Sequence, residues 1–171
     1  EAAPTLTGVR TIIQGLQTAG LDPMRLAAIM RQADEGDAQS YLEVAEQIEE
    51  KDPHYMSVLG TRKRAVAQMD IQVTAASDDP LDVANAELVE EFLKRDELQG
   101  ELFDILDAIG KGYSVTEIIW DELGIDQWTI KELKWRDPRW FAYDPHDGTT
   151  LKLRGDGGQL VDMTPYKYIV H

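Results

Sequence analysis

The chain has 171 residues, of which 43% are hydrophobic and 29% charged, enough for one folded domain with or without an appended arm. It carries 32 acidic and 17 basic residues, and a net charge of −15 opposes nucleic-acid binding, which needs clustered Lys and Arg. Cysteine is absent, so disulfides and thiolate metal sites are excluded, and no apolar run approaches the ~20 residues of a membrane helix.

The ends of the chain differ from its middle. Residues 1–21 contain Pro4, three glycines and four threonines, which predicts an extended N-terminal arm with a weak apolar patch at residues 9–16. Residues 22–171 are expected to form the folded domain. The first residue is not Met, and residues 166–171 resemble a strand rather than a frayed tail, so we expect a fragment of a longer protein.

Helices are predicted mostly within residues 22–112. Asp22-Pro23 and Asp52-Pro53 each place an N-cap residue before a proline at the first helical position, and residues 77–80 (SDDP) are predicted as a turn that leads into a helix. A further helix is predicted after Asp96, over residues 98–109, ended by Gly110 and Gly112. In the helix after Pro80, one face is apolar, and its members are Leu81, Ala84, Leu88, Phe92 and Leu93.

A change to alternating polarity predicts strands mostly within residues 113–171. The pattern indicates a strand at 113–121, a loop at 121–126 and a second hairpin strand whose phase slips by one residue, which favours a β-bulge. Shorter strands are predicted at residues 140–143, 151–153, 159–163 and 166–170, with turns at 145–148 and 155–158. One strand, at 70–75, is predicted among the helices. Helices followed by antiparallel strands indicate an α+β fold.

Groups that could carry chemistry are scattered. His54, His146 and His171 show no metal-ligand spacing, and no phosphate-binding glycine loop is present. The densest carboxylates are Glu43, Glu46, Glu49 and Glu50, which we assign to the solvated outer face of a helix. The sequence therefore predicts no catalytic residue, cofactor or metal site. An enzyme, such as a carboxylate-dependent hydrolase, is the least favoured reading.

Two stretches are candidates for binding. Arg62, Lys63 and Arg64 form the only dense basic cluster, which either contacts DNA phosphates or lies exposed and pairs with nearby acids. The segment from Trp135-Arg136 to Arg139-Trp140 has the composition of a protein-interface hot spot. Alternatively, the two tryptophans pack in the core, one from each strand, and one of the arginines pairs with Asp137.

Several dispersed strings together resemble the Mu-like bacteriophage and prophage portal proteins. They are residues 31–41 (RQADEGDAQSY), 51–55 (KDPHY), 59–66 (LGTRKRAV), 75–78 (AASD), 106–112 (LDAIGKG), 117–120 (EIIW), 133–141 (LKWRDPRWF) and 165–171 (PYKYIVH). The resemblance spans nearly the whole chain.

The resemblance implies a fold and a role. Portal proteins are longer, continuing into stem, clip and crown regions, so this chain would be the outer, wing-like portion. They form rings, typically dodecamers, at one capsid vertex, contact the terminase packaging motor and head proteins, and let double-stranded DNA pass without sequence-specific binding. The implied location is the virion, after assembly in the host bacterial cytoplasm, with no catalytic residue, cofactor or membrane contact. The alternative is an acidic adaptor or protein-binding module that shares the wing fold without portal activity.

Overall fold

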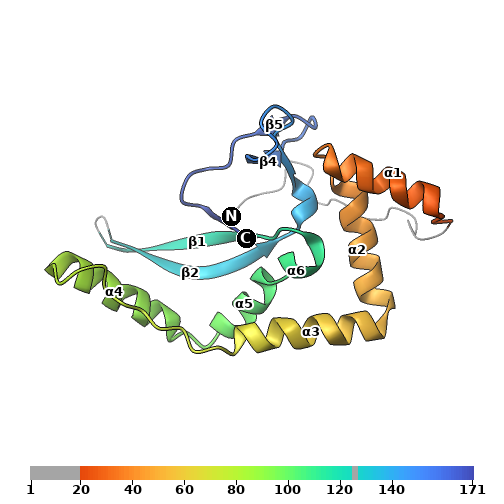
Figure 1. The fold of residues 1–171 in the computed structure, drawn as a ribbon. Coiled ribbons are helices and arrows are strands. Elements are labelled where there is room, and N and C mark those ends of the chain that lie inside the picture. Colours follow the sequence, from red (N-terminus) through yellow and green to blue (C-terminus); the bar gives the residue numbers. More distant parts are fainter. Residues whose placement is uncertain (1–19, 125–126) are drawn as a thin grey trace.

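The computed structural model describes residues 20–124 and 127–171, so nearly all of the predicted arm at 1–21 lies outside the described residues. Helices precede antiparallel strands, which confirms the α+β prediction (Figure 1). The helices are α1 (Pro23–Asp34), α2 (Gln39–Lys51), α3 (Pro53–Ala67), α4 (Pro80–Leu93), α5 (Leu98–Ile105) and α6 (Ala108–Lys111). The other elements are β1 (Val115–Gly124), β2 (Gln127–Arg136), the 3-10 turn η1 (Pro138–Trp140), β3 (Phe141–Tyr143), β4 (Leu151–Arg154), β5 (Leu160–Val161) and β6 (Tyr168–Val170).

Three of the helices begin where the sequence predicts. The side chain of Asp22 accepts a hydrogen bond from the Arg25 amide (2.7 Å), and Asp52 accepts from the Tyr55 amide (3.0 Å). Asp79 accepts from the Leu81 amide (2.8 Å). In each case the aspartate satisfies an amide of the first turn that has no partner within the helix, and the proline after it needs none. The Asp-Pro pairs are confirmed as the starts of α1, α3 and α4.

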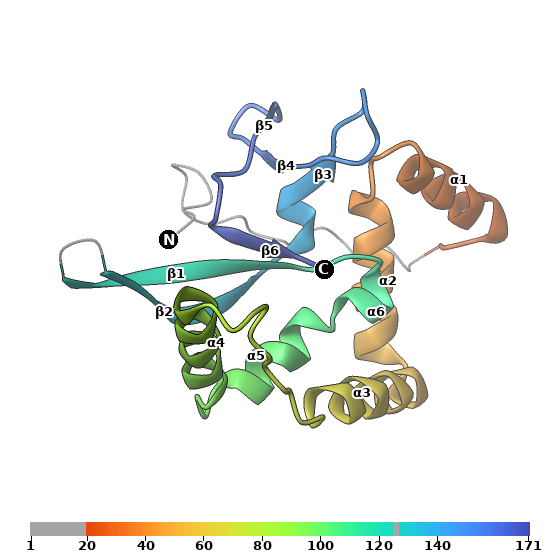
Figure 2. The same cartoon turned by 60° about the vertical axis from the view of Figure 1, so that its left-hand side comes forward.

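The strands form two three-stranded antiparallel sheets, ordered β2-β1-β6 and β3-β4-β5. The predicted bulge is confirmed: Ile119 faces Glu132 and Trp120 faces Ile130, so Lys131 is the extra residue in β2. The hairpin is longer than predicted because β1 continues to Gly124 through most of the expected loop. It extends away from the rest of the sheet towards α4 (Figure 2).

Two predictions in the helical half are wrong. Residues 70–75 form no strand, and Ile71 is half exposed, because alternating polarity gives a strand only where a neighbour completes the hydrogen-bond ladder. The helix predicted over 98–109 divides into α5 and α6. Between them, Asp107 turns its side chain towards two lysines.

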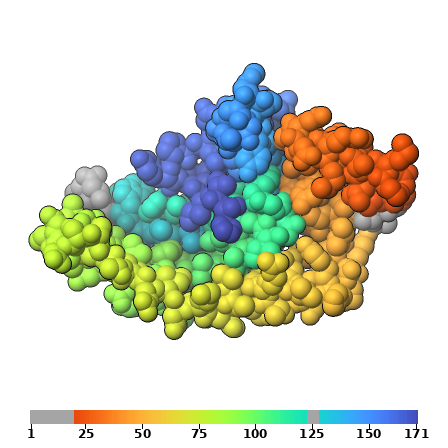
Figure 3. All heavy atoms as spheres, in the orientation of Figure 1, coloured from red at the N-terminus to blue at the C-terminus, as the bar shows by residue number. Residues whose placement is uncertain are grey.

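A small core joins the helical and strand halves. It consists of Leu42, Tyr113, Val115, Phe141 and Leu151. The hydroxyl of Tyr113 donates a hydrogen bond to the Pro138 carbonyl (2.8 Å), so this buried phenol is satisfied. Around that core, α1, α2 and α3 follow one side of the molecule and α4 lies at its far end (Figure 3).

Gly112 ends α6 in the left-handed region, at φ 89°. A Cβ at this position would meet no atom within 4 Å, so only backbone strain opposes a side chain there. We expect Gly112→Ala to lower the free energy of unfolding by about 1 kcal/mol in urea unfolding. Gly100→Ala is the matched control, because Gly100 is helical with equally open surroundings and should gain stability. Equal effects of the two substitutions would contradict the role given to Gly112.

Candidate functional site: internal charge networks and an apolar groove

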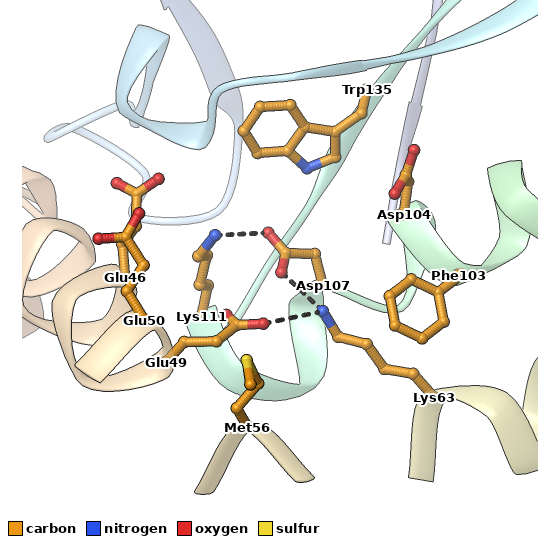
Figure 4. A pocket seen from close by; sticks show the side chains of 10 residues that line it. All are labelled: Glu46, Glu49, Glu50, Met56, Lys63, Phe103, Asp104, Asp107, Lys111 and Trp135. Carbon is orange, nitrogen blue, oxygen red and sulfur yellow. Dashed lines mark hydrogen bonds and ion pairs between the residues drawn. The ribbon is translucent and has the colours of Figure 1, made fainter. Parts of the chain in front are cut away.

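A pocket of about 360 Å³ opens between α2, α3, the α5–α6 region and β2 (Figure 4). Its lining combines five carboxylates with two lysines and an apolar side. The lining residues are Glu46, Glu49, Glu50, Met56, Lys63, Phe103, Asp104, Asp107, Lys111 and Trp135.

Asp107 binds two lysines at the centre of this pocket. Its two carboxylate oxygens accept hydrogen bonds from Lys63 Nζ and Lys111 Nζ, both at 2.8 Å. Lys63 also lies 3.6 Å from Glu49, and each lysine stands over an aromatic ring, Phe103 or Trp135. Burial alone would raise the pKa of Asp107, but the hydrogen bonds from Lys111 and Lys63 lower the pKa below its ordinary value of 3.8.

The basic cluster at 62–64 is therefore divided. Lys63 is buried because it shares the inner stripe of α3 with Leu59 and Ala67, which corrects the expectation that the whole triplet is exposed. Arg62 and Arg64 are exposed, and neither forms an ion pair within the described part of the chain. Whether they contact DNA stays a prediction.

A second network joins α2 to the turn after β2. Arg139 lies 2.9 Å from Glu46 and 2.7 Å from Asp137. Glu43 is 6% exposed, and the side chains of Glu46 and Glu49 are 32% and 26% exposed and pair with Arg139 and Lys63. The prediction of a solvated outer face is therefore wrong for these three glutamates, while Glu50 is exposed. Desolvation raises the pKa of Glu46 despite the nearby Arg139.

A third network crosses the first sheet. Glu117 is completely buried, and its carboxylate accepts a hydrogen bond from Arg136 Nε (2.6 Å) and lies 3.1 Å from Lys167 Nζ. The Arg136 guanidinium also stands 5.9 Å from the ring centre of Trp140. Sequence reasoning missed Glu117, because its place among apolar residues of β1 gave no sign of the two cations that face it.

The two arginines of the segment predicted as a protein interface form ion pairs within the fold. Arg136 pairs with Glu117, while Arg139 pairs with Asp137, as in the other reading of this segment. Trp135 and Trp140 are partly buried. Contact of this segment with another protein stays a prediction.

The three networks of ion pairs connect separate elements of the fold, which is typical of a structural role rather than of a reactive centre. Each of the carboxylates Asp107, Asp137 and Glu117 is held by at least one cation within 3.1 Å. Over residues 20–124 and 127–171, no group of three or more potential ligands is placed to hold a metal ion. None of the helices described is both long and apolar enough to cross a bilayer.

A separate apolar groove of about 400 Å³ lies between α4 and the β1–β2 hairpin. Its lining residues are Leu88, Val89, Glu91, Phe92, Arg95, Trp120, Trp128, Thr129 and Ile130. Arg95 in this lining stacks on Phe92 and pairs with Glu101. No residue of α4 is buried, and Leu88 is 66% and Trp128 59% exposed. The predicted apolar face of α4 is therefore present, but much of it is exposed to solvent and does not pack against the core.

Comparison with known proteins decides the family. A family model described as the portal protein of Mu bacteriophage matches residues 42–171. The chain belongs to this portal protein family. The Mu-like prophage FluMu protein gp29 of Haemophilus influenzae is 35% identical over 156 residues, and the portal protein of Escherichia phage Mu is 31% identical over 156 residues. Each alignment covers 90% of this chain but only 30% of the relative's length.

Membership of the portal family confirms the resemblance drawn from the dispersed strings. The matched range begins in α2 and runs to the last residue, so it contains the three charge networks and the apolar groove. The features described above therefore belong to the portal-family part of the chain.

Proposed function

We propose that the chain is the wing-like portion of a phage portal subunit, part of the ring at a capsid vertex through which DNA is packaged and ejected. One observation carries the proposal, namely the family match over residues 42–171 together with a relative named as the portal protein of phage Mu. Residues 22–171 form the wing-like domain in this proposal.

The structure supports a scaffold role. Three ion-pair networks connect α2 and α3 to α6, α2 to the turn after β2, and β1 to β2 and the segment before β6. In this proposal the pairs fix the relative placement of elements, since a buried ion pair adds little net stability over an apolar pair. We infer that the chain is not an enzyme, since the buried carboxylates serve these connections.

The proposed partners follow from the portal role. They are identical subunits in a ring, with twelve as the expected number, the terminase packaging motor and head proteins. The location is the virion, preceded by assembly in the host cytoplasm. Double-stranded DNA would pass without sequence-specific contacts, and a charge of −15 disfavours tight binding of phosphates that would slow its passage.

Ring formation by the full-length protein tests the proposal. Negative-stain images of the purified full-length protein should show closed rings with a central channel. Single particles without a channel, at every concentration and salt condition tested, would contradict it and favour the acidic adaptor.

DNA binding gives a second test. At low salt, where attraction to phosphate is strongest, we expect the 171-residue chain to bind a double-stranded oligonucleotide more weakly than micromolar in fluorescence anisotropy. A basic DNA-binding protein serves as the positive control. Submicromolar affinity would contradict the proposed repulsion between this part of the portal and DNA.

A further inference from the structure

The apolar groove offers no unpaired charge to an occupant. Arg95 of its lining pairs with Glu101. Glu91, the other charged residue of the lining, lies 3.5 Å from Lys94. The remaining lining residues are neutral and mostly apolar, and they are Leu88, Val89, Phe92, Trp120, Trp128, Thr129 and Ile130. Because burying a charge without a partner is costly, an occupant should be apolar and uncharged along the side that it inserts.

The predicted N-terminal arm contains a segment with this property. Its apolar residues recur at spacings of three and four, as on one face of a helix, and they are Leu6, Val9, Ile12, Ile13 and Leu16. Arg10 is the only charged residue between positions 2 and 19, although 29% of the chain is charged. With 3.6 residues per turn, Arg10 falls beside this stripe. The exposed stripe of α3 from Val58 to Val66 differs, because Arg62 lies in its middle.

The connection to α1 is too short for this segment to reach the groove of its own chain. Leu16 is joined to Pro23, the first residue of α1, by six residues, so the two lie at most about 25 Å apart. Helix α1 begins at one end of the molecule, whereas α4 and the hairpin lie at the other (Figures 1 and 3). Between these ends lie α1 and α3, whose 12 and 15 residues extend over about 18 and 22 Å. The groove within reach of the segment therefore belongs to another copy.

We propose that residues 6–16 bind as a helix in the groove between α4 and the β1–β2 hairpin of a neighbouring copy. Ile12 and Ile13 enter the apolar lining, and Arg10 stays at the border in contact with solvent. This is the helix-in-groove mode, whose anchors recur at i, i+3, i+4 and i+7. In this proposal the helix forms on binding, since Gly8 and Gly15 disfavour it in isolation.

The contact joins two different surfaces of identical subunits. The arm of one copy enters the groove of the next, whose own arm enters the groove of the copy after it. Head-to-tail contacts of this kind produce a ring when the rotation closes. The inference rests on the proposed ring function and assigns it a contact between subunits.

Cysteine cross-linking tests the contact, because the 171 residues contain no cysteine. In the full-length protein, with any cysteine beyond residue 171 replaced by serine, Ile12→Cys and Val89→Cys together should give a ladder of disulfide-linked oligomers on oxidation. Each single variant should remain a monomer on a denaturing gel, because position 12 meets only position 89 of the next copy. Thr11→Cys with Val89→Cys is the matched control and should cross-link far less, since Thr11 lies on the opposite side of the helix from the apolar stripe.

Three cross-linking results would overturn the contact. A disulfide between positions 12 and 89 within one monomer would place the arm in the groove of its own chain. Equal ladders from positions 11 and 12 would show that no defined helix face enters the groove. A dimer from Val89→Cys alone would show that α4 packs against α4 of another copy.

Access to the groove provides an independent test. In full-length assemblies that carry Val89→Cys alone, the arm should protect the thiol from a maleimide. Ile12→Gln with Ile13→Gln should speed labelling about tenfold or more, since two apolar side chains are lost from the contact. Thr7→Gln with Thr11→Gln, on the opposite side of the helix, is the matched control and should leave the rate unchanged. The same labelling rate with and without the isoleucine substitutions would overturn the inference.

The outcomes separate this inference from the portal function. Wild-type rings that show neither the cross-link nor the change in labelling would overturn the contact and leave the portal function standing. A wild-type protein that forms no rings in negative-stain images contradicts the portal function, and the proposed ring contact fails with it.

Discussion

Glu117→Gln is expected to lower the free energy of unfolding by about 3–5 kcal/mol. Glu117 is fully buried and faces Arg136, whose side chain is 8% exposed, and Lys167, which is 29% exposed. Glutamine keeps the shape of the side chain but leaves the Arg136 charge buried without a counter-ion, which is the costly way to break a buried pair. Urea unfolding followed by tryptophan fluorescence measures the loss.

A double variant separates charge from packing. Glu117→Leu with Arg136→Met removes both charges and keeps most of the buried volume, so it should be much less destabilised than Glu117→Gln, because a matched apolar pair often replaces a buried ion pair at little cost. Glu122→Gln, an exposed residue of the same strand, is the surface control and should change stability by less than about 0.5 kcal/mol. A loss below 1 kcal/mol for Glu117→Gln would contradict the view that this ion pair holds the sheet.

Asp107→Asn should destabilise the chain by about 3 kcal/mol, since it removes the shared partner of Lys63 and Lys111. The effect should also depend on pH. The pKa of Asp107 is lower in the folded chain than its ordinary 3.8, so the ionised carboxylate stabilises the fold above that pH. This contribution declines as the pH falls through the lower folded pKa.

The comparison between wild type and Asp107→Asn isolates this group. In the wild type, the raised pKa values of Glu46 and Asp104 act in the opposite direction, because protonation at low pH relieves their unfavourable burial. Both proteins share Glu46, whose titration cancels in the comparison, whereas that of Asp104 cancels only in part, because burial and then the Asp107 charge raise its pKa. The stability difference between them should therefore shrink below pH 4 and remain constant above pH 6, as measured by urea unfolding. A difference that stays unchanged down to pH 2 would contradict the ion-pair role of Asp107.

Local signals in the sequence predicted local features of the fold. The Asp-Pro pairs gave the helix starts, because an aspartate cap and a proline act on amides within one turn. The one-residue slip in polarity gave the bulge at Lys131, because side chains in a strand alternate strictly between its faces. Gly112 likewise ends α6 through its own backbone conformation, a left-handed φ that favours glycine.

Features that depend on distant partners were not predicted. Lys63 lies on the inner stripe of α3, and its charge is stabilised there by Asp107, which lies 44 residues away in the chain. Ile71 alternates with polar neighbours as a strand residue would, but residues 70–75 pair with none of the strands that the structure describes. Helix α4 has the apolar face of a packed helix, and periodicity alone does not say whether the core or another molecule covers that face.

The most direct test of the portal role is to locate this chain in an assembled particle. A single cysteine at Asp156, in the exposed turn between β4 and β5, can carry a gold label on the full-length protein in an otherwise infectious phage. Electron cryotomography should then show label at one vertex of each capsid. Label at every vertex, or on no capsid, would contradict the assignment of this chain to a portal ring.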